Sequence, residues 1–213
     1  MIYKGEIFVC TDAKGAIWQL GTLPPPIGEV MLVSWKTSAA AVDAGVPQEI
    51  ATIFIDAMLA LGNILFPVAE PIPLADGDQI LLKGRIPFRR MRLLSTRNRD
   101  SARLLFDDGN YPWWMQGQAA VLYENQHFND SLTPKDFQKL FSDGWAVGAA
   151  DLCARGAAAV IRPGVDGDVF GLFTAEVARQ AAFSSELEKA AGLAGYRFRK
   201  LSETDLTSEL AEG

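Results

Sequence analysis

The stretch VPQEIATIFIDAMLALGN, residues 46–63, predicts the central helix of the fold. Its apolar residues follow the i, i+3, i+4, i+7 spacing of a helix, and further apolar residues occupy the opposite side. Pro47 fits the first helical position, and Glu49 suits the positive end of the helix dipole. A helix that is apolar all round is typical of a buried core position, so we expect the rest of the chain to pack around it.

The same apolar run, which extends to residue 69, raises the alternative of a membrane span. We reject it because Asp56 would lie inside the bilayer and because Gly62 and Asn63 end the helix early. Residues 1–6 also lack the charged and apolar regions of a secretory signal. We therefore expect a soluble, cytoplasmic protein without a membrane partner.

Strand-like segments lie on both sides of this helix. Before it, residues 5–10 and 16–20 predict a hairpin, and residues 29–35 predict a strand that is buried on both faces. After it, Asp76-Gly77-Asp78 predicts a turn that leads into a strand at residues 79–84. The remaining N-terminal predictions are a strand near residues 88–94, a second hairpin formed by residues 102–106 and 111–115, and a strand at residues 118–124.

The C-terminal part alternates helix and strand patterns. Thr133 and Pro134 predict a helix start, and residues 145–154 predict a second helix that stops before Gly156. Two strands at residues 157–163 and 168–173 follow, and Thr174 fits the N-cap of a helix that ends near residue 191. The last elements are a strand at residues 195–201 and, from about Ser202, a frayed acidic tail.

These elements predict an α+β fold. A mostly antiparallel N-terminal sheet packs on one apolar helix and is followed by an αα-β-β-α-β C-terminal part. With 213 residues, the chain suits a single compact domain over residues 1–213. The polar segment at residues 124–132 suggests a division into a strand-rich subdomain, residues 1–126, and an α/β subdomain, residues 130–213.

Positive charge is concentrated in one segment, residues 83–103. This segment holds eight basic residues and one acid, Asp100, and so carries +7. Because the whole chain carries −6, the remainder carries −13, and the protein is an acidic body with one basic segment. The segment has two interpretations. Its arginines form an anion-binding surface, or they pair with the carboxylates of the rest of the chain.

Aromatic residues follow this basic segment directly. Trp113 and Trp114 are adjacent, so in a strand their rings would point to opposite faces, one toward the core and one toward a surface or partner. Arginine and aromatic side chains are enriched in protein interfaces. The sequence-predicted binding residues are Arg85, Arg89, Arg90, Arg92, Arg97, Tyr111, Trp113 and Trp114.

Catalytic and cofactor signatures are missing from the sequence. His127 is the only histidine, and Cys10 and Cys153 form neither a CxxC pair nor a metal-ligand spacing. The chain has no GxSxG, GxGxxG or GxxxxGK[ST] motif, and the VDGD loop at residues 165–168 lacks the ligand series of an EF-hand. We therefore predict no catalytic residue, no cofactor and no metal.

The sequence favours a non-enzymatic binding protein of the immunity or adaptor type, which acts through a protein–protein interface. The alternative is an enzyme or receptor for a small anionic ligand, held by Arg85, Arg89, Arg90 or Arg92. Nucleic-acid binding is the third interpretation, and the net charge of −6 disfavours it.

Overall fold

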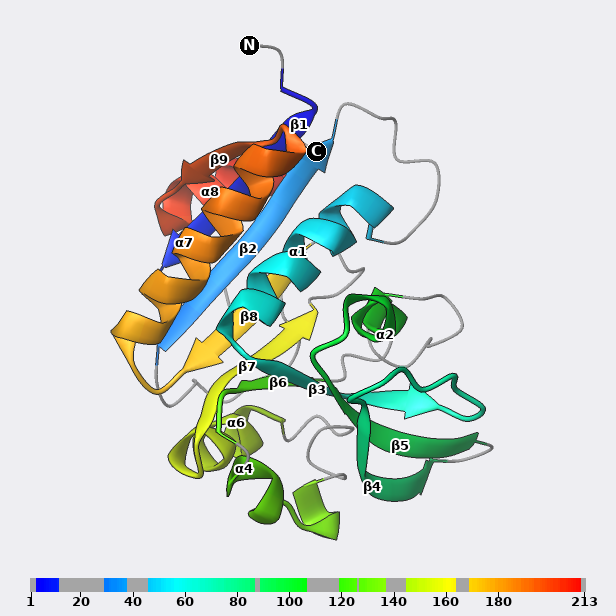
Figure 1. Cartoon of the computed structure of the whole chain (residues 1–213). Coiled ribbons are helices and arrows are strands. Elements are labelled where there is room, and N and C mark those ends of the chain that lie inside the picture. The colour runs from blue at the N-terminus through cyan, green and yellow to red at the C-terminus, as the bar shows by residue number, and fades with distance from the viewer. Residues whose placement is uncertain are drawn as a thin grey trace.

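A computed structural model describes residues 3–11, 29–37, 46–86, 89–106, 119–125, 127–136, 145–163 and 169–211. Its strands form one nine-stranded sheet (Figure 1). They are β1 Gly5–Thr11, β2 Glu29–Thr37, β3 Asn63–Ala69, β4 Gln79–Ile86, β5 Arg89–Thr96, β6 Ala120–Tyr123, β7 Ala157–Pro163, β8 Val169–Thr174 and β9 Arg197–Lys200. The helices are α1 Gln48–Leu61, α2 Arg99–Arg103, α4 His127–Asp130, α6 Trp145–Ala154, α7 Val177–Ala194 and α8 Glu203–Ala211.

The strand order across the sheet is β4-β5-β3-β6-β7-β8-β2-β1-β9. Every neighbouring pair is antiparallel except β1 and β9, which are parallel. Helices accompany this mostly antiparallel sheet, so the predicted α+β class is confirmed. The N-terminal and C-terminal strands interleave within the same sheet.

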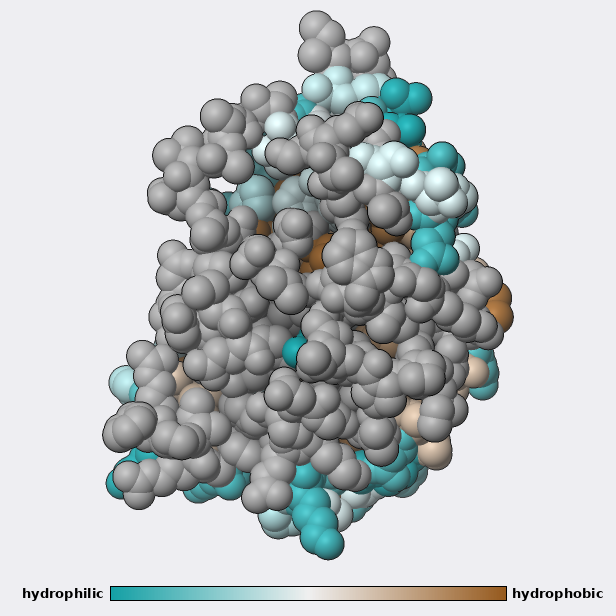
Figure 2. All heavy atoms as spheres, turned by 180° about the vertical axis from the view of Figure 1, so that it is seen from behind, coloured by the Kyte–Doolittle hydropathy of each residue, from teal (hydrophilic) through white to brown (hydrophobic). Residues whose placement is uncertain are grey.

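Helices cover both faces of the sheet. Alternate residues of β1 show the two sides: Ile7 and Val9 pack with α1 and α7, whereas Phe8 and Cys10 belong to the core that α4, α6 and α8 cover. Figure 1 shows α1 and α7 side by side in front of the sheet. Seen from behind, the hydrophilic described residues gather along the upper right and the lower margin (Figure 2).

The predicted central helix is confirmed as α1. Ile50, Ile53 and Phe54 are all at most 1% exposed, because the helix packs on the sheet and alongside its neighbour α7. The helix begins at Gln48, so Pro47 occupies the N-cap and not the first helical position, and Gly62 follows its last residue. The expected burial of β2 on both faces is also confirmed, since its central residues contribute to both cores.

Aromatic rings join α1 to the sheet. Phe54 of α1 meets Phe170 of β8 edge-on, with 4.7 Å between ring centroids. Trp35 of β2 lies 5.9 Å from Phe54 and 5.2 Å from Phe170. These contacts bury apolar surface and fix how the helix lies on the sheet.

Strand β3, which contains Pro67, has no counterpart among the elements predicted from the sequence. Proline is excluded from most central strands because it donates no ladder hydrogen bond. Here β3 pairs with β6 only through Asn63–Leu65, while its pairing with β5 extends to Ala69. Pro67 stands opposite Leu93 of β5, so this proline lies within the ladder of an inner strand.

The strand predicted at residues 102–106 is wrong. Residues 99–103 form helix α2, and residues 104–106 continue as one turn of 3₁₀ helix. Asn98 caps α2, because its Oδ1 accepts hydrogen bonds from the N–H groups of Asp100 and Ser101 at 2.9 and 3.2 Å. The proposed partner strand, residues 111–115, lies outside the described residues.

The predicted C-terminal tail is also wrong, because residues 203–211 form helix α8. Leu206 is fully buried in the core that α4, α6 and α8 cover. Ser202 caps the helix, since its Oγ accepts from the N–H of Asp205 and donates to the Asp205 carboxylate. The buried leucine and the cap both anchor this acidic segment as a helix.

Several other boundaries differ from the prediction. β1 pairs with β2 and β9, whereas its predicted hairpin partner, residues 16–20, lies outside the described residues. Thr174 ends β8 and donates to the carbonyl of Glu176, which is the N-cap of α7. The predicted turn at Gly77 is present. Strands β4 to β9 and helix α6 lie near their predicted positions.

Candidate functional site

The basic segment forms much of an antiparallel hairpin at one border of the sheet. β4 is the outermost strand there and pairs with β5. The register sets Lys83 opposite Arg92 and Arg85 opposite Arg90. We name Lys83, Arg85, Arg89, Arg90 and Arg92 the cationic hairpin.

Like charges stand opposite each other in this hairpin. Directly opposed residues of an antiparallel pair share one face, with β-carbons about 5 Å apart, and equal charges at that spacing are destabilising. Lys83 and Arg90 are exposed, and neither forms an ion pair with another described residue. Arg92 is half-buried, and its Nε donates to the carboxylate of Glu70. Among the described side chains Lys83, Arg90 and Arg92, only Arg92 is paired with an acid, Glu70.

Not all of the sequence-predicted residues meet here. Arg89 stands opposite Ile86 at the loop end of the hairpin. Arg97 is exposed and follows the other end of β5, so it is separated from that loop end by the length of the strand. Residues 107–118, which include Tyr111, Trp113 and Trp114, lie outside the described residues. Lys83, which the sequence-predicted set does not include, joins the cationic hairpin through the strand register.

Other arginines of the basic segment pair with the protein's own acids. Arg99 donates to the Asp56 carboxylate at 2.6 Å, and Arg103 donates to Asp100 at 3.3 Å. The internal-pairing interpretation therefore describes this part of the segment. Farther along the hairpin, the described side chains of Lys83 and Arg90 are exposed.

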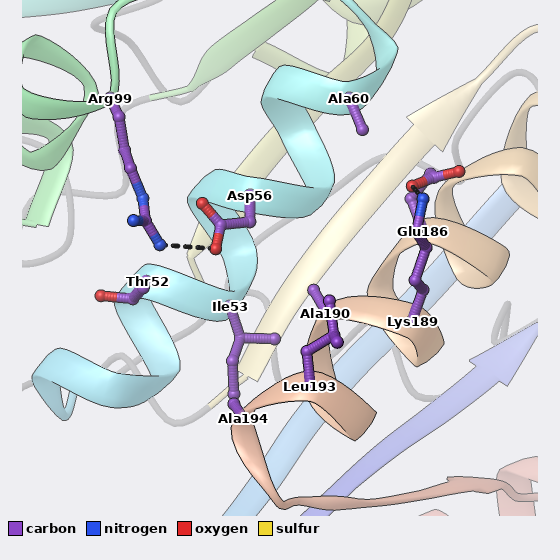
Figure 3. A pocket seen from close by; sticks show the side chains of 10 residues that line it. All are labelled: Thr52, Ile53, Asp56, Ala60, Arg99, Glu186, Lys189, Ala190, Leu193 and Ala194. Atoms are coloured by element: carbon purple, nitrogen blue, oxygen red, sulfur yellow. Dashed lines mark hydrogen bonds and ion pairs between the residues drawn. The ribbon is translucent and has the colours of Figure 1, made fainter.

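A groove of about 460 Å³ lies between α1 and α7, next to α2 (Figure 3). The helices contribute an apolar surface: Ile53 and Ala60 from α1, and Ala190, Leu193 and Ala194 from α7. Leu193 is 84% exposed, which is unusual for a large apolar side chain. No sequence pattern indicated this groove, because its residues come from three separate segments.

Two ion pairs flank the groove. The Asp56–Arg99 pair joins α1 to α2, and the Glu186–Lys189 pair, at 3.5 Å, lies along α7 (Figure 3). The side chains of Arg99 and Lys189 are 50% and 70% exposed. Exposed pairs of this kind contribute only about 0–1 kcal/mol. A charged ligand can therefore exchange partners with them at small energetic cost.

A third polar cluster is structural. Arg155, which follows α6, donates to both carboxylate oxygens of Asp136, at 2.7 and 3.1 Å, and to the carbonyl of Ser131 at 2.7 Å. Burial by itself raises the pKa of the Asp136 carboxyl, but the bonds from Arg155 and Thr133 outweigh it and lower the pKa to about 2. An acid with so low a pKa is a poor general base at neutral pH. The cluster instead fastens residues 131–136 to α6.

The remaining reactive side chains stand apart from these sites. His127 is 88% exposed, with its Nδ1 3.9 Å from the Asp130 carboxylate. Burial raises the pKa of the Cys153 thiol, which disfavours the reactive thiolate. Cys10 is buried and also free of any disulfide. Searching the described ranges reveals no group of three or more side chains able to hold a metal ion.

Comparison of the chain with protein-family models, curated proteins and solved structures found no match. In the part of the chain that the structure describes, no helix is both long enough and apolar enough to cross a membrane.

Proposed function

We propose that this protein is a non-enzymatic binding protein that recognises an acidic segment of another protein through the cationic hairpin. The opposition of Lys83 to Arg92 and of Arg85 to Arg90 carries this proposal. Such pairs destabilise the free hairpin, and a carboxylate-bearing partner relieves the repulsion on binding. Arginine suits this role because its guanidinium donates two parallel hydrogen bonds to one carboxylate.

The charge distribution favours a protein partner over nucleic acid. Outside residues 83–103 the chain carries −13, so a long polyanion would be repelled beyond the small area of the hairpin. A short acidic segment that ends within this area avoids that repulsion. The hairpin is also an extended ladder, whereas small ligands bind mostly in concave sites.

A displayed library of random peptides tests the proposal. We expect acid-rich sequences to be enriched on the wild-type protein and to be lost when selection uses the Lys83→Glu/Arg90→Glu variant. Both side chains are exposed, so the fold should tolerate these changes. Lys135→Glu is the matched control, because Lys135 is also exposed and lies near α4. Enrichment without acidic residues, or equal loss with the control, would refute the proposal.

The α1–α7 groove favours a second candidate, a receptor for a small anionic ligand. Its volume of about 460 Å³ falls within the range of small-molecule sites. Arg99 and Lys189 offer cations beside the apolar surface, so the fitting ligand is a carboxylate with an apolar body. This candidate uses none of the arginines that the sequence singled out for an anion site.

Thermal unfolding with a panel of aliphatic and aromatic carboxylates tests this second candidate. A ligand present at 100 times its Kd would add about 2.7 kcal/mol of stability. Lys189→Ala should abolish the stabilisation, and Lys135→Ala, which removes the same charge elsewhere, should leave it intact. Absence of any stabilising carboxylate would eliminate the groove as such a receptor.

A further inference from the structure

The border strand β4 offers more than charge to a partner. It ends the described sheet on one side and has a described strand, β5, on its inner side only. The opposite border, β9, has four residues and is followed directly by α8, whereas β4 has eight. Figure 1 shows the β4–β5 hairpin at the lower right margin of the fold. An edge strand carries main-chain N–H and C=O groups that a further strand can pair with.

A bulge divides β4 into two parts. The register with β5 shifts between Ile80 and Leu82, so the first part of the strand is irregular. From Leu82 to Ile86 each residue has a partner in β5 without interruption. This regular part spans roughly 17 Å at about 3.4 Å per residue. It therefore accommodates a short strand of about five residues.

We propose that an acidic, extended segment of the partner protein adds to the outer edge of β4 along Leu82–Ile86 as a further strand of the sheet. This inference rests on the proposed function and specifies how the partner binds. Main-chain hydrogen bonds supply the alignment, and the cationic hairpin supplies the charge preference.

The alternation of β4 specifies the partner's sequence. Lys83 lies on the same face of the hairpin as its opposite residue Arg92, while Leu82 packs toward the core beneath the sheet. A docked strand places every second side chain beside Lys83 and its neighbours on that face. We therefore expect acids at alternate positions of the partner, with apolar or small residues between them.

Charges and bulges also protect edge strands against unwanted pairing. Charges on the edge strand itself serve this protection, whereas this hairpin also opposes cations of β4 with cations of β5, twice in the register. The second row of cations lies on β5, one strand inward from the edge that needs protection. It does increase the attraction for an acidic strand that pairs with β4.

Three synthetic peptides of equal composition test the mode of binding by fluorescence anisotropy. The first repeats the order Thr-Glu-Val-Glu, the second groups all glutamates together, and the third is the first with alternate main-chain nitrogens methylated. We expect the first to bind about tenfold or more tightly than the other two, because each alteration removes aligned hydrogen bonds or charges. Hydrogen exchange should show new protection of amides within residues 82–86 when the first peptide is bound.

The outcomes separate this inference from the proposed function. If alternating and grouped peptides bind equally, and both are lost in Lys83→Glu/Arg90→Glu, charge recognition stands and strand addition is wrong. Strand addition is also wrong if no peptide binds, or if the amides of residues 82–86 gain no protection from exchange. In that case the selection from the peptide library still tests the proposed function separately. Lys135→Glu should bind all three peptides as the wild type does.

Discussion

Replacement of Asp136 by Asn should destabilise the protein in a pH-dependent manner. The Asp136 side chain is 2% exposed and accepts both hydrogen bonds of the Arg155 fork. Its pKa of about 2, against an ordinary value of 3.8, corresponds to about 2 kcal/mol of folding free energy at neutral pH. Arg155 keeps a second partner, Asp151 at 2.9 Å, so the loss should stay below the 3–5 kcal/mol typical of a broken buried pair.

The sign of the pH dependence follows from the lowered pKa. A carboxyl with a depressed folded-state pKa stabilises the protein fully above its ordinary value of 3.8, and this stability is lost as the pH falls toward 2. The Asn variant lacks this titration. Its deficit relative to the wild type should therefore be about 2 kcal/mol at pH 7 and shrink to about half of that at pH 3.

Urea unfolding followed by tryptophan fluorescence at pH 7, 5 and 3 measures this deficit. Asp151→Asn is the control, because Asp151 is 48% exposed and its pair with Arg155 should contribute less than about 1 kcal/mol. A deficit for Asp136→Asn below about 0.5 kcal/mol at pH 7, or one that stays constant down to pH 3, would refute the structural role of this carboxylate.

Further variants test other features of the fold. Gly195 has a φ of +84° at the C-cap of α7, so Gly195→Ala should lower the free energy of unfolding by about 1 kcal/mol in urea titrations. Gly192, inside the same helix, has open space at its α-carbon, so Gly192→Ala should raise it by about 0.5–1 kcal/mol; equal signs for the two would contradict the assigned backbone conformations. Leu206→Ala should cost about 2–4 kcal/mol and increase amide exchange in α8, whereas an unchanged midpoint would mean that α8 does not dock. A double-mutant cycle on Asp56 and Arg99 should give a coupling below about 1 kcal/mol, and a larger value would contradict the exposed nature of the pair.

Elements with local signals could be predicted from the sequence. Helix α1 follows from apolar spacing between Pro47 and Gly62, and helix α6 from a pattern that ends at Gly156, whose φ is +109°. Helix α8 had a local signal as well, the capping pair Ser202 and Asp205, but the acidic composition of the segment obscured it. An acidic composition indicates a solvated segment, but Leu206 of this helix is fully buried.

Elements that depend on distant partners could not be predicted. Pro67 lies inside β3, opposite Leu93 of β5, and sequence order alone does not contain that pairing. The opposition of Lys83 to Arg92 likewise depends on the strand register and on the bulge before Leu82. The groove requires Asp56, Arg99 and Lys189 to meet from three segments. For these features the deciding interactions are tertiary, so a window of neighbouring residues carries no signal.

The place of the β7–β8 hairpin in the sheet affects how the chain can fold. β7 pairs with β6 on one side, and β8 pairs with β2 on the other. Before these two strands are made, β4-β5-β3-β6 and β2-β1 are separate pieces with no ladder between them. A nascent chain must therefore keep the apolar strand faces of both pieces from aggregating until Ala157–Thr174 has left the ribosome. Folding during synthesis should consequently be late and cooperative, with the two pieces acquiring protection together.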